Sequence, residues 1–594
     1  MRIKYNQTSK GRCYYIIRSV YRNGRNTSET YEKLGYPEDI KRERGCLDPE
    51  KWMQEYLEEL NEKEQSEKNT TVLVPYNPSA LIPMHQQQAF NVGYLFLQQV
   101  YYGLCLDLIC RHISKRHAFR YDMNAILSRL VYGRILFPGS KLFTLRHAWD
   151  LLEPPGFEYH QMQRALSVIA AEFDLIQTEL YKYSSQLVPR KTGVLYYDCT
   201  NFYFETEEED DISNQEADEK DIAARKYAVS KQHQPSPLVQ MGLFMDYSGI
   251  PLAVCINRGN MNEQQTLMPL EEKILQDFEL SRFVVCTDAG LSSDANRKFN
   301  NFGERSFVTT VSIKAMAKEL KAWCLDPCGW RAEGENKTYD IRHLEDSDKE
   351  KEENYKKTFY KQKYIEGYDE ERDIAFHQTL IVTYSLKYRD YLGRKRDAQV
   401  QRALKAIDAG SSALEKKNAH DYRRFVKKKA ADRKGKDVKI AYSLNEEAIS
   451  AEKVFDGFYA VETNLDDDVH DILKINHGRW EIEESFRIMK DDFRSRPAYV
   501  SRNDRIKAHF MTCFIALLVY RILEKKTGEE FTCGEMTETL RSMQVTKVKD
   551  IGYQPSYTRT EVTEVLHETA GFRTDYELTR EKAMRGIIRK SKKR

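Results

Sequence analysis

The sequence has no apolar run long enough to cross a membrane and no secretory leader at its first residues. The longest apolar run, Phe510 to Tyr520, ends at Arg521 and falls well short of the roughly 20 residues that a bilayer requires. The first residues, MRIKYNQTSKGR, lack the apolar stretch of a secretory signal. We therefore expect a cytoplasmic protein without a membrane partner.

Paired cysteines of the kind that bind zinc or build a disulfide framework are also scarce. The 11 cysteines are scattered singly, apart from Cys324 and Cys328 in CLDPC and Cys105 and Cys110 in an apolar helical segment. One C-x3-C pair without a second pair is weak support for a zinc site. Buried reduced thiols are the better interpretation.

An excess of one charge is missing too. Lys and Arg total 93 and Asp and Glu total 91, a formal net charge of +2, which taken alone argues against a protein that binds nucleic acid. The charges are unevenly distributed, however. Residues 411–440 hold eleven Lys or Arg against four acids, residues 580–594 hold eight against one, and residues 205–221 hold ten acids against Lys220. The basic runs are either solvated surfaces or sites of phosphate contact. The acidic loop cannot lie along a phosphate backbone, so it is expected either to project from the protein, which is favoured, or to shield a phosphate-binding site while that site is empty.

The remaining composition is that of a globular protein with several domains. Of 594 residues, 41% are hydrophobic, 31% charged and 11% aromatic, which excludes a wholly disordered or collagen-like chain. Changes in hydrophobic period predict the organisation of the chain. The expected order is a small α+β unit with a turn at Asn23-Gly24 (1–65), a linker (66–83), an all-helical domain (84–188), an α/β domain in two parts (189–312 and 456–530) around a charged insertion subdomain (313–455), and a basic C-terminal region, helical or disordered (531–594).

Two aspartates follow short apolar strands of the expected α/β domain. Asp198 comes after Val194 to Tyr197, and Asp288 comes after Phe283 to Thr287. Two carboxylates on neighbouring strand ends repel each other unless a cation or a proton lies between them. Oxygen ligands of this kind suit Mg²⁺ or Mn²⁺. The alternative is that each is an ordinary strand-terminal or helix-capping residue.

Residues from about 466 to 493 are expected to be helical, with a break near Gly478. Within them, the segment GRWEIEESFRIMKDDF predicts a helix with one functional face. At about 100° per residue, Arg479, Glu483 and Lys490 fall on one stripe, beside an apolar face that is expected to pack on the sheet. The alternative is a ladder of salt bridges on a solvated face, stabilising by about 0.3 to 0.5 kcal/mol per pair. Trp480 is expected either to pack in the core, which is favoured, or to stack on a displaced base.

These residues together resemble a known family. Asp198 in YYDCTNFYFE, Asp288 in VVCTDAGLSS and Glu483 in GRWEIEESFRIMK resemble the acid triad of DDE-type transposases from bacterial insertion sequences. Segments such as RILFPGSK (134–141) and INRGNMNEQQTL (256–267) agree with this resemblance. It extends over most of the chain, from roughly residue 85 to residue 525.

Within that family, the chain resembles the IS-four superfamily, in its branch with long N-terminal regions. The superfamily carries a Tyr-x2-Arg-x3-Glu-x6-Lys signature, and Arg479, Glu483 and Lys490 match its spacing. Asn476 stands where the tyrosine is expected. One contact to DNA is therefore either absent or supplied by another residue such as Tyr499.

The resemblance implies an RNase H-like fold for the α/β domain and the activity of a DNA transposase. Two Mg²⁺ or Mn²⁺ ions held by Asp198, Asp288 and Glu483 would support hydrolysis at the element ends and attack of the freed 3′-OH on target DNA. The implied partners are double-stranded DNA, as terminal inverted repeats and as target, and a second copy of the chain in a homodimer. The protein would be bacterial and would associate with the nucleoid when it is bound to DNA.

The residues expected to contact DNA surround Glu483 or lie in the basic part of the insertion. They are Arg479, Lys490, Trp480 and Asn476 in the first group and Arg423, Lys427 and Lys428 in the second. Recognition of the element ends is expected from the helical region, with Lys141, Arg146 and Arg164 as candidate contacts, and from the N-terminal unit.

Two alternatives remain at this point. A metal-dependent nuclease of the same fold would cut DNA without joining it, and a domesticated DNA-binding protein would do neither. The departure at Asn476 keeps the second alternative open.

Overall fold

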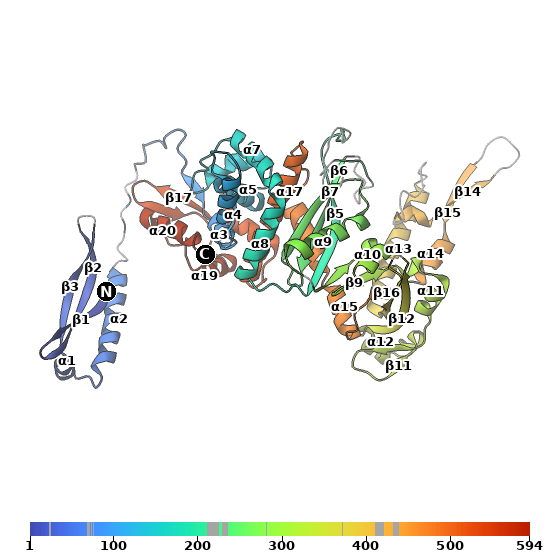
Figure 1. The fold of residues 1–594 in the computed structure, drawn as a ribbon, viewed down its shortest axis with the longest axis horizontal. Coiled ribbons are helices and arrows are strands. Elements are labelled where there is room, and N and C mark those ends of the chain that lie inside the picture. Colours follow the sequence, from blue (N-terminus) through green and yellow to red (C-terminus); the bar gives the residue numbers. More distant parts are fainter. Residues whose placement is uncertain are drawn as a thin grey trace. The chain divides into compact units, whose positions relative to one another are not determined.

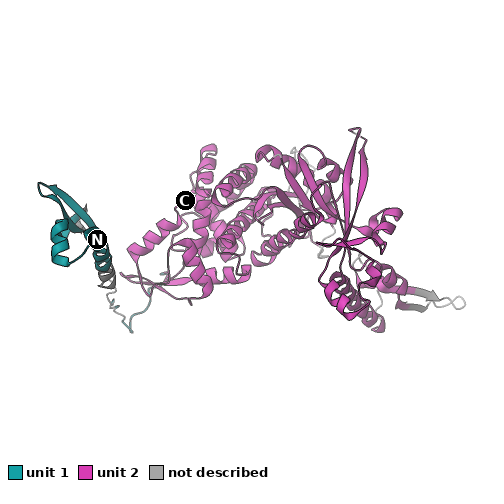
Figure 2. Ribbon diagram, turned by 90° about the horizontal axis from the view of Figure 1, so that it is seen from below, with its two compact units in different colours: residues 1–86 teal, residues 87–594 magenta. Residues whose placement is uncertain are grey.

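A computed structural model describes residues 1–594 apart from 23–24, 68–71, 73, 75–76, 211–224, 229–235, 281, 371, 410–420 and 432–438. The chain divides into two compact units, Met1–Gln86 and Gln87–Arg594 (Figures 1 and 2). The expected turn at Asn23-Gly24 lies outside the described residues. So do most of the acidic loop and much of the basic run in the insertion.

The first unit is a three-stranded antiparallel sheet covered on one face by helices. The strands are β1 (Arg2–Thr8), β2 (Gly11–Arg22) and β3 (Arg25–Gly35), in that spatial order, and the helices are α1 (Pro37–Arg44) and α2 (Pro49–Glu67). Tyr14 and Ile16 of β2 pack against Met53 of α2. The predicted small α+β unit is present, with one strand more than the hairpin that the sequence indicated.

The second unit begins with a region rich in helices. Its helices are α3 (Tyr94–Gly103), α4 (Leu106–Arg116), α5 (Met123–Leu136), α6 (Lys141–His147), α7 (Tyr159–Ala171) and α8 (Phe173–Leu187). This region is not wholly helical, because β4 (Ala89–Asn91) pairs with β17 (Gln544–Val548) near the other end of the chain.

The C-terminal region is folded, and its described residues form part of the helical region rather than a basic tail. Its elements are α18 (Cys533–Ser542), β17, β18 (Gly552–Pro555), α19 (Glu561–Ala570), β19 (Thr579–Arg580) and α20 (Glu581–Ser591). Two of its terminal cations form ion pairs with the helical region, Lys592 with Glu153 at 2.5 Å and Arg594 with Asp107 at 2.6 Å.

One helix, α17 (Asn503–Lys526), is long and apolar enough to span a membrane by length and composition. It includes the apolar run that ends at Arg521. In the structure 94% of its apolar window is buried, against α5, α7 and β7 (Pro251–Arg258) among others. It therefore has the surroundings of a core helix in a globular protein.

The largest sheet in the described part of the chain has ten strands, in the order β11-β10-β12-β13-β16-β9-β8-β5-β6-β7. Only the β5–β8 and β8–β9 pairings are parallel in this sheet. The strands not yet defined are β5 (Val194–Tyr203), β6 (Leu238–Asp246), β8 (Phe283–Thr287), β9 (Arg305–Val311), β10 (Trp330–Ala332), β11 (Thr338–Tyr339), β12 (Phe359–Asp369), β13 (Ile374–Tyr384) and β16 (Phe458–Thr463).

The described residues of the insertion at 313–455 contribute four strands to this sheet. β13 pairs with β16 from Thr379 to Tyr384, so β10 to β13 continue the sheet beyond β16 and β9. The insertion also has structure of its own, as expected. It comprises the helices α11 (Lys318–Leu325), α12 (Asp348–Tyr355), α13 (Leu386–Asp408) and α14 (Glu446–Lys453) and the hairpin of β14 (Val426–Ala431) and β15 (Lys439–Leu444) (Figure 1).

Helices pack on both faces of the sheet at β5 and β8. On one face Leu195 and Val285 form a core with Ile274 of α9 (Leu267–Asp277), near α10 (Asp294–Phe299). On the other face Tyr196 and Cys286 belong to the main core, which includes α17. Alternate residues of a strand point to opposite faces. The residues two positions after Tyr196 and Cys286 therefore also face the main core.

Glu271 on α9 gives this fold a stability that depends on pH. Its carboxylate accepts hydrogen bonds from Asn300 Nδ2 at 2.9 and 3.1 Å, and burial raises its pKa from 4.5 to about 8. Because folding raises this pKa, the folded protein binds the Glu271 proton more tightly than the unfolded chain does. The stabilisation that comes from this proton is fully present below the unfolded pKa and is lost as the pH rises through 8. Denaturant titrations measure the free energy of unfolding. Between pH 5 and 9 we expect this free energy to fall by roughly 3 to 5 kcal/mol more in the wild type than in Glu271→Gln. Parallel pH profiles of the two proteins would contradict this expectation.

Candidate active site beside strands β5 and β8

Asp198 and Asp288 lie at the same level of two neighbouring strands. β5 runs parallel to β8, and the last pair between them is Tyr196 with Cys286. Asp198 and Asp288 each follow that pair by two residues, and both are half-buried. The fold therefore places both aspartates two residues beyond the same strand pair, on the face of the sheet that meets the main core.

The expected strand boundary at Asp198 is wrong. β5 does not end there but continues to Tyr203, and Asp198 pairs with Leu243 of β6. The strand is longer because β6 continues to supply hydrogen bonds after β8 has ended. Asp288 follows β8 directly, as predicted, and its Oδ1 accepts a hydrogen bond from the Gly290 amide at 2.9 Å.

The helix that carries Glu483 crosses the same face of the sheet. The expected break near Gly478 is confirmed, since α15 (Val469–His477) ends there and α16 (Trp480–Arg487) follows, with a π-helical turn at Ile488–Asp492. A Cβ on Gly478 would lie 2.1 Å from the hydroxyl of the buried Tyr196. Glycine at this position thus allows the helix to approach β5 closely.

Within α16, Ile482 and Phe486 point inward and Glu483 points outward. Ile482 and Phe486 are buried in the main core with Tyr196, whereas the Glu483 side chain is 65% exposed. The three acids therefore lie on one side of the sheet. Among the described residues, however, no three carboxylate, His or Cys side chains lie close enough together to hold a metal ion.

Arg479 lies between Glu483 and the strands. Its Nη2 is 3.6 Å from Glu483 Oε1, and its Nη1 donates a hydrogen bond to Thr310 Oγ1 of β9 at 3.1 Å. Burial raises the pKa of the Cys286 thiol on β8 to about 12, and the positive charge of Arg479 partly offsets this rise. The guanidinium is thus held over β8 and β9 with one edge toward Glu483.

Asn476, which replaces the signature tyrosine, is a buried hydrogen-bonding residue. It is 8% exposed, its Nδ2 donates to Tyr459 Oη at 3.0 Å, and its Oδ1 lies 3.3 Å from Thr310 Oγ1. Tyr459 Oη and Thr310 Oγ1 are 2.7 Å apart. Asn476 therefore helps to fix Thr310, the hydrogen-bond acceptor of Arg479, and presents little surface for direct contact with DNA.

Lys490 lies beside the strand that carries Asp198. Its Nζ donates a hydrogen bond to Thr200 Oγ1 on β5 and lies 5.6 Å from the ring of Phe202 and 5.8 Å from that of Phe486. Thr200 is in phase with Asp198 along β5. Arg479, Glu483 and Lys490, which match the signature, thus occupy one area. Lys490 is hydrogen-bonded to Thr200 on β5 and does not extend the salt bridge between Arg479 and Glu483.

Two aromatic residues that lie near the signature residues in sequence are exposed. Trp480 is 53% exposed, so the favoured prediction that it packs in the core is wrong. Tyr499, the suggested substitute for the signature tyrosine, is also exposed. Both lie close in sequence to the residues that match the signature.

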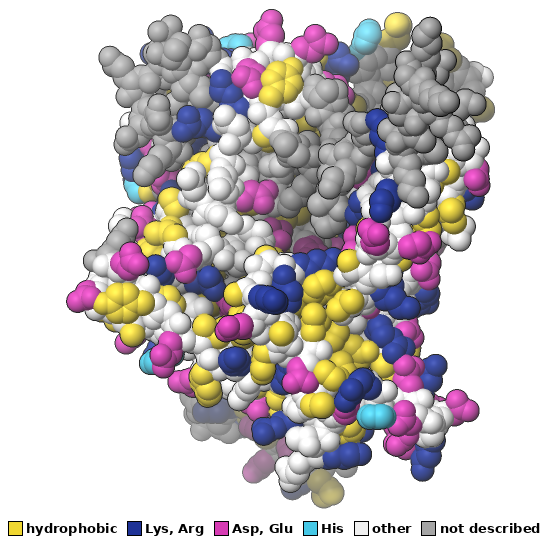
Figure 3. Space-filling model, turned by 90° about the vertical axis from the view of Figure 1, so that its right-hand side faces the viewer, with side chains coloured by type: hydrophobic (Ala, Val, Ile, Leu, Met, Phe, Trp, Pro, Cys, Tyr) yellow, Lys and Arg dark blue, Asp and Glu magenta, His cyan; other side chains and the backbone are white. Residues whose placement is uncertain are grey.

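The DNA-contact candidates of the insertion lie at the start of the β14–β15 hairpin. Arg423 lies 3.7 Å from Asp421, and Lys427 lies 3.4 Å from Glu447, while Lys428 is exposed. On the face drawn in Figure 3, the coloured basic and acidic side chains are interspersed. Among the described residues, no contact joins these candidates to Glu483.

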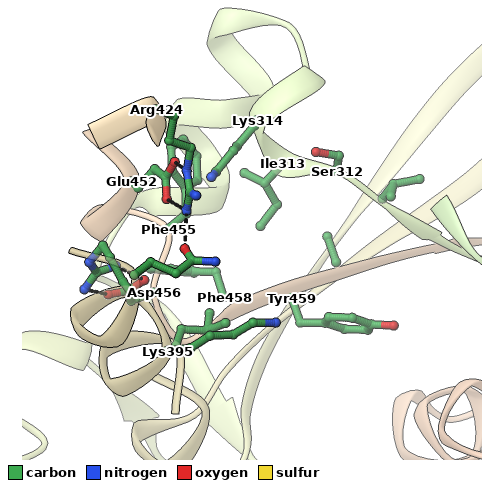
Figure 4. A pocket seen from close by; sticks show the side chains of 15 residues that line it. Ser312, Ile313, Lys314, Lys395, Arg424, Glu452, Phe455, Asp456, Phe458 and Tyr459 are labelled. Carbon is green, nitrogen blue, oxygen red and sulfur yellow. Dashed lines mark hydrogen bonds and ion pairs between the residues drawn. The ribbon is translucent and has the colours of Figure 1, made fainter. Parts of the chain in front are cut away.

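A cavity of about 410 Å³ lies near these residues, and the sequence did not indicate it. Its acids are paired, Glu452 with Arg424 at 2.6 Å and Asp456 with Arg396 at 2.5 Å. Lys314 and Lys395 lie on opposite sides of it (Figure 4). Tyr459, whose hydroxyl bonds to Asn476, forms part of its wall. No motif marks these residues, because they come from four separate segments of the chain.

Lys141 was a candidate DNA contact in the helical region, and this prediction is wrong. The side chain is 4% exposed, its Nζ lies 3.1 Å from His509 Nδ1, and burial lowers its pKa to about 7. It belongs to the contact between α6 and α17. A lysine followed by an apolar helical segment gives no sequence signal of such burial.

A comparison with protein families assigns the chain to one of them. The family described as "Transposase DDE domain" matches residues 211–519, more than half of the chain, so this chain belongs to the DDE transposase family. The match includes Asp288 and Glu483 and begins after Asp198. No curated protein matches the chain.

Among solved structures, the chain is similar to a piggyBac transposase synaptic complex with hairpin DNA, determined by cryo-electron microscopy. The identity is 8%, the TM-score is 0.32, and the match covers 84% of this chain and 85% of that one. At that TM-score the similarity adds nothing to the family assignment. The fold class is the predicted one, an α/β, RNase H-like transposase fold with a large mixed sheet.

Proposed function

We propose that this chain is a DNA transposase of the IS-four type that cleaves the ends of an insertion sequence and joins the freed 3′-OH to target DNA. The observation that supports this most is the register of β5 and β8. Asp198 and Asp288 each follow the last β5–β8 pair by two residues, on the sheet face that the helix carrying Glu483 crosses. The family membership supports the same reaction class.

The three carboxylates suit a divalent metal in chemistry and in placement. They offer only oxygen ligands, which Mg²⁺ and Mn²⁺ prefer, and two of them come from paired parallel strands. We propose that Asp198, Asp288 and Glu483 hold two such ions, which would supply Lewis-acid stabilisation of the phosphate under attack. The proposal requires the exposed Glu483 to turn toward the aspartates when metal and DNA bind.

The cations beside the acids have distinct parts in this proposal. Arg479, whose guanidinium is oriented by Thr310, would hold two oxygens of a phosphate next to the cleaved bond. Lys490 would hold a further phosphate as a point charge. Trp480, which is exposed, would stack on a base. Arg423, Lys427 and Lys428 would contact the DNA backbone, and two copies of the chain would bring two element ends together.

The test is a cleavage assay with purified full-length protein and duplex DNA that carries the ends of its own element. With Mg²⁺ we expect a cut at the element end and, with target DNA present, a joined 3′ product, whereas chelation of the metal should abolish both. Mapping the cut on each strand defines the reaction. Cleavage without any joined product would support the nuclease alternative. Binding without cleavage in Mg²⁺ or Mn²⁺ would support a non-catalytic DNA-binding protein and reject the transposase.

A further inference from the structure

The N-terminal unit has a strongly basic sheet. Residues 1–28 contain seven Lys or Arg and no Asp or Glu. The helices α1 and α2 cover one face of the sheet, where Ile3 packs with Tyr14 and Ile16. Among the described residues of this unit, no helix packs on the opposite face of the sheet, and the strand register sets which side chains that face carries.

That opposite face carries a row of residues across all three strands. Lys4 of β1 pairs with Tyr15 of β2, and Tyr15 pairs with Lys33 of β3. In the next row Arg2 pairs with Ile17. Directly paired residues share a face, and Lys4 lies on the face opposite to Ile3 because successive side chains alternate. Ile17 is 6% exposed and lies beneath this face. Arg2, Lys4, Tyr15 and Lys33 therefore form one surface, which we call the basic sheet face.

The charges of the basic sheet face are not neutralised within the unit. Arg2, Lys4 and Lys33 are exposed, and none of them forms an ion pair with a carboxylate among the described residues. Glu32 of β3 belongs to the other face, where it contacts Arg44 at 3.4 Å and Tyr56 at 2.9 Å. The surface thus combines three available cations with an aromatic side chain at its centre.

We propose that the basic sheet face binds double-stranded DNA, with the central strand directed at the major groove. Neighbouring strands lie about 4.8 Å apart, so β1 and β3 are roughly 10 Å apart, close to the roughly 12 Å width of that groove. Lys4 and Lys33, on the two outer strands, then face the two phosphate backbones. Tyr15 faces the base edges, and Arg2 adds a third phosphate contact. This assignment rests on the proposed function only in that the partner is DNA.

The test uses full-length protein and a matched pair of triple variants. Arg2→Ala/Lys4→Ala/Lys33→Ala removes three cations from the basic sheet face, and Lys41→Ala/Arg42→Ala/Lys51→Ala removes three exposed cations from α1 and α2. Fluorescence anisotropy measures the affinity for end duplex and for random duplex at several KCl concentrations. For the first variant we expect affinity to fall roughly 10-fold or more and the slope of log K against log salt to shrink by about 3. The control should keep the wild-type slope.

The outcomes separate this assignment from the transposase proposal. The assignment would be overturned if the first variant kept the wild-type slope of log K against log salt, or if the control variant lost as much DNA affinity as the first. The basic sheet face would then bind another anionic partner. Thermal melting checks that the exposed substitutions leave the fold intact. Cleavage at saturating DNA is measured in parallel. A wild-type protein that binds through this face but never cleaves would reject the transposase and keep the DNA-binding face.

Discussion

Replacement of Glu483 by Gln is expected to lower Mg²⁺-dependent cleavage of element-end DNA at least about 100-fold, with DNA binding retained. The amide keeps the size and shape of the side chain but loses the charge that a divalent cation requires. Asp198→Asn and Asp288→Asn are expected to behave in the same way, because each of these carboxylates follows the last β5–β8 pair by two residues. Initial rates at saturating DNA measure the effect on the chemical step.

The neighbouring Glu484 provides the control for this substitution. It lies on the same helix but pairs with Arg487, so Glu484→Gln should cleave at close to the wild-type rate. A Glu483→Gln protein that cleaves as fast as Glu484→Gln would show that Glu483 is not part of the acid set. It would leave the fold and the family assignment unaffected.

Replacement of Gly478 by Ala is expected to lower cleavage about 100-fold without unfolding the protein. The backbone of Gly478 has φ −61°, which alanine adopts freely, so the cost is steric. The added Cβ would lie 2.1 Å from Tyr196 Oη, and relief of that contact pushes the start of α16 away from β5. Displacement of reacting groups by about 1 Å costs on the order of 100-fold in rate, and overpacking costs about 1 to 3 kcal/mol in stability.

Two further variants test this explanation. Gly586→Ala, in the exposed part of α20, meets no atom within 4 Å and should be neutral or slightly stabilising through helix propensity. Tyr196→Phe removes the oxygen that the new Cβ would meet first, so the double variant Gly478→Ala/Tyr196→Phe should recover part of the activity. Equal activity of the single and double variants would contradict the steric account.

The sequence predicted the elements that local pattern controls. The strands around Asp198 and Asp288, the break at Gly478 and the apolar face of α16 follow from hydrophobic period and glycine, which act over a few residues. The spacing of Arg479, Glu483 and Lys490 then indicated one stripe of a helix, and the structure keeps these residues in one area. The triad itself stays a prediction until variants are assayed.

What the sequence could not predict depends on partners distant in the chain. The end of β5 is set by β6, the burial of Lys141 by His509, and the role of Asn476 by Tyr459 and Thr310. Asn476 illustrates the difference, because its mismatch with the signature suggested a lost DNA contact. The structure instead shows a hydrogen bond to a tyrosine on β16. A residue that acts through another residue leaves no spacing pattern of its own.

The pairing of β4 with β17 has a consequence for biosynthesis. Asn91 donates hydrogen bonds to the carbonyl oxygens of Leu540 and Arg541, which lie 449 and 450 residues further along the chain. The helical region therefore lacks its last strands and helices until the ribosome has made nearly the whole chain. A nascent or prematurely terminated polypeptide would expose the apolar face of α3 that α19 and α20 cover, and would be a substrate for chaperones and proteases before it could act on DNA.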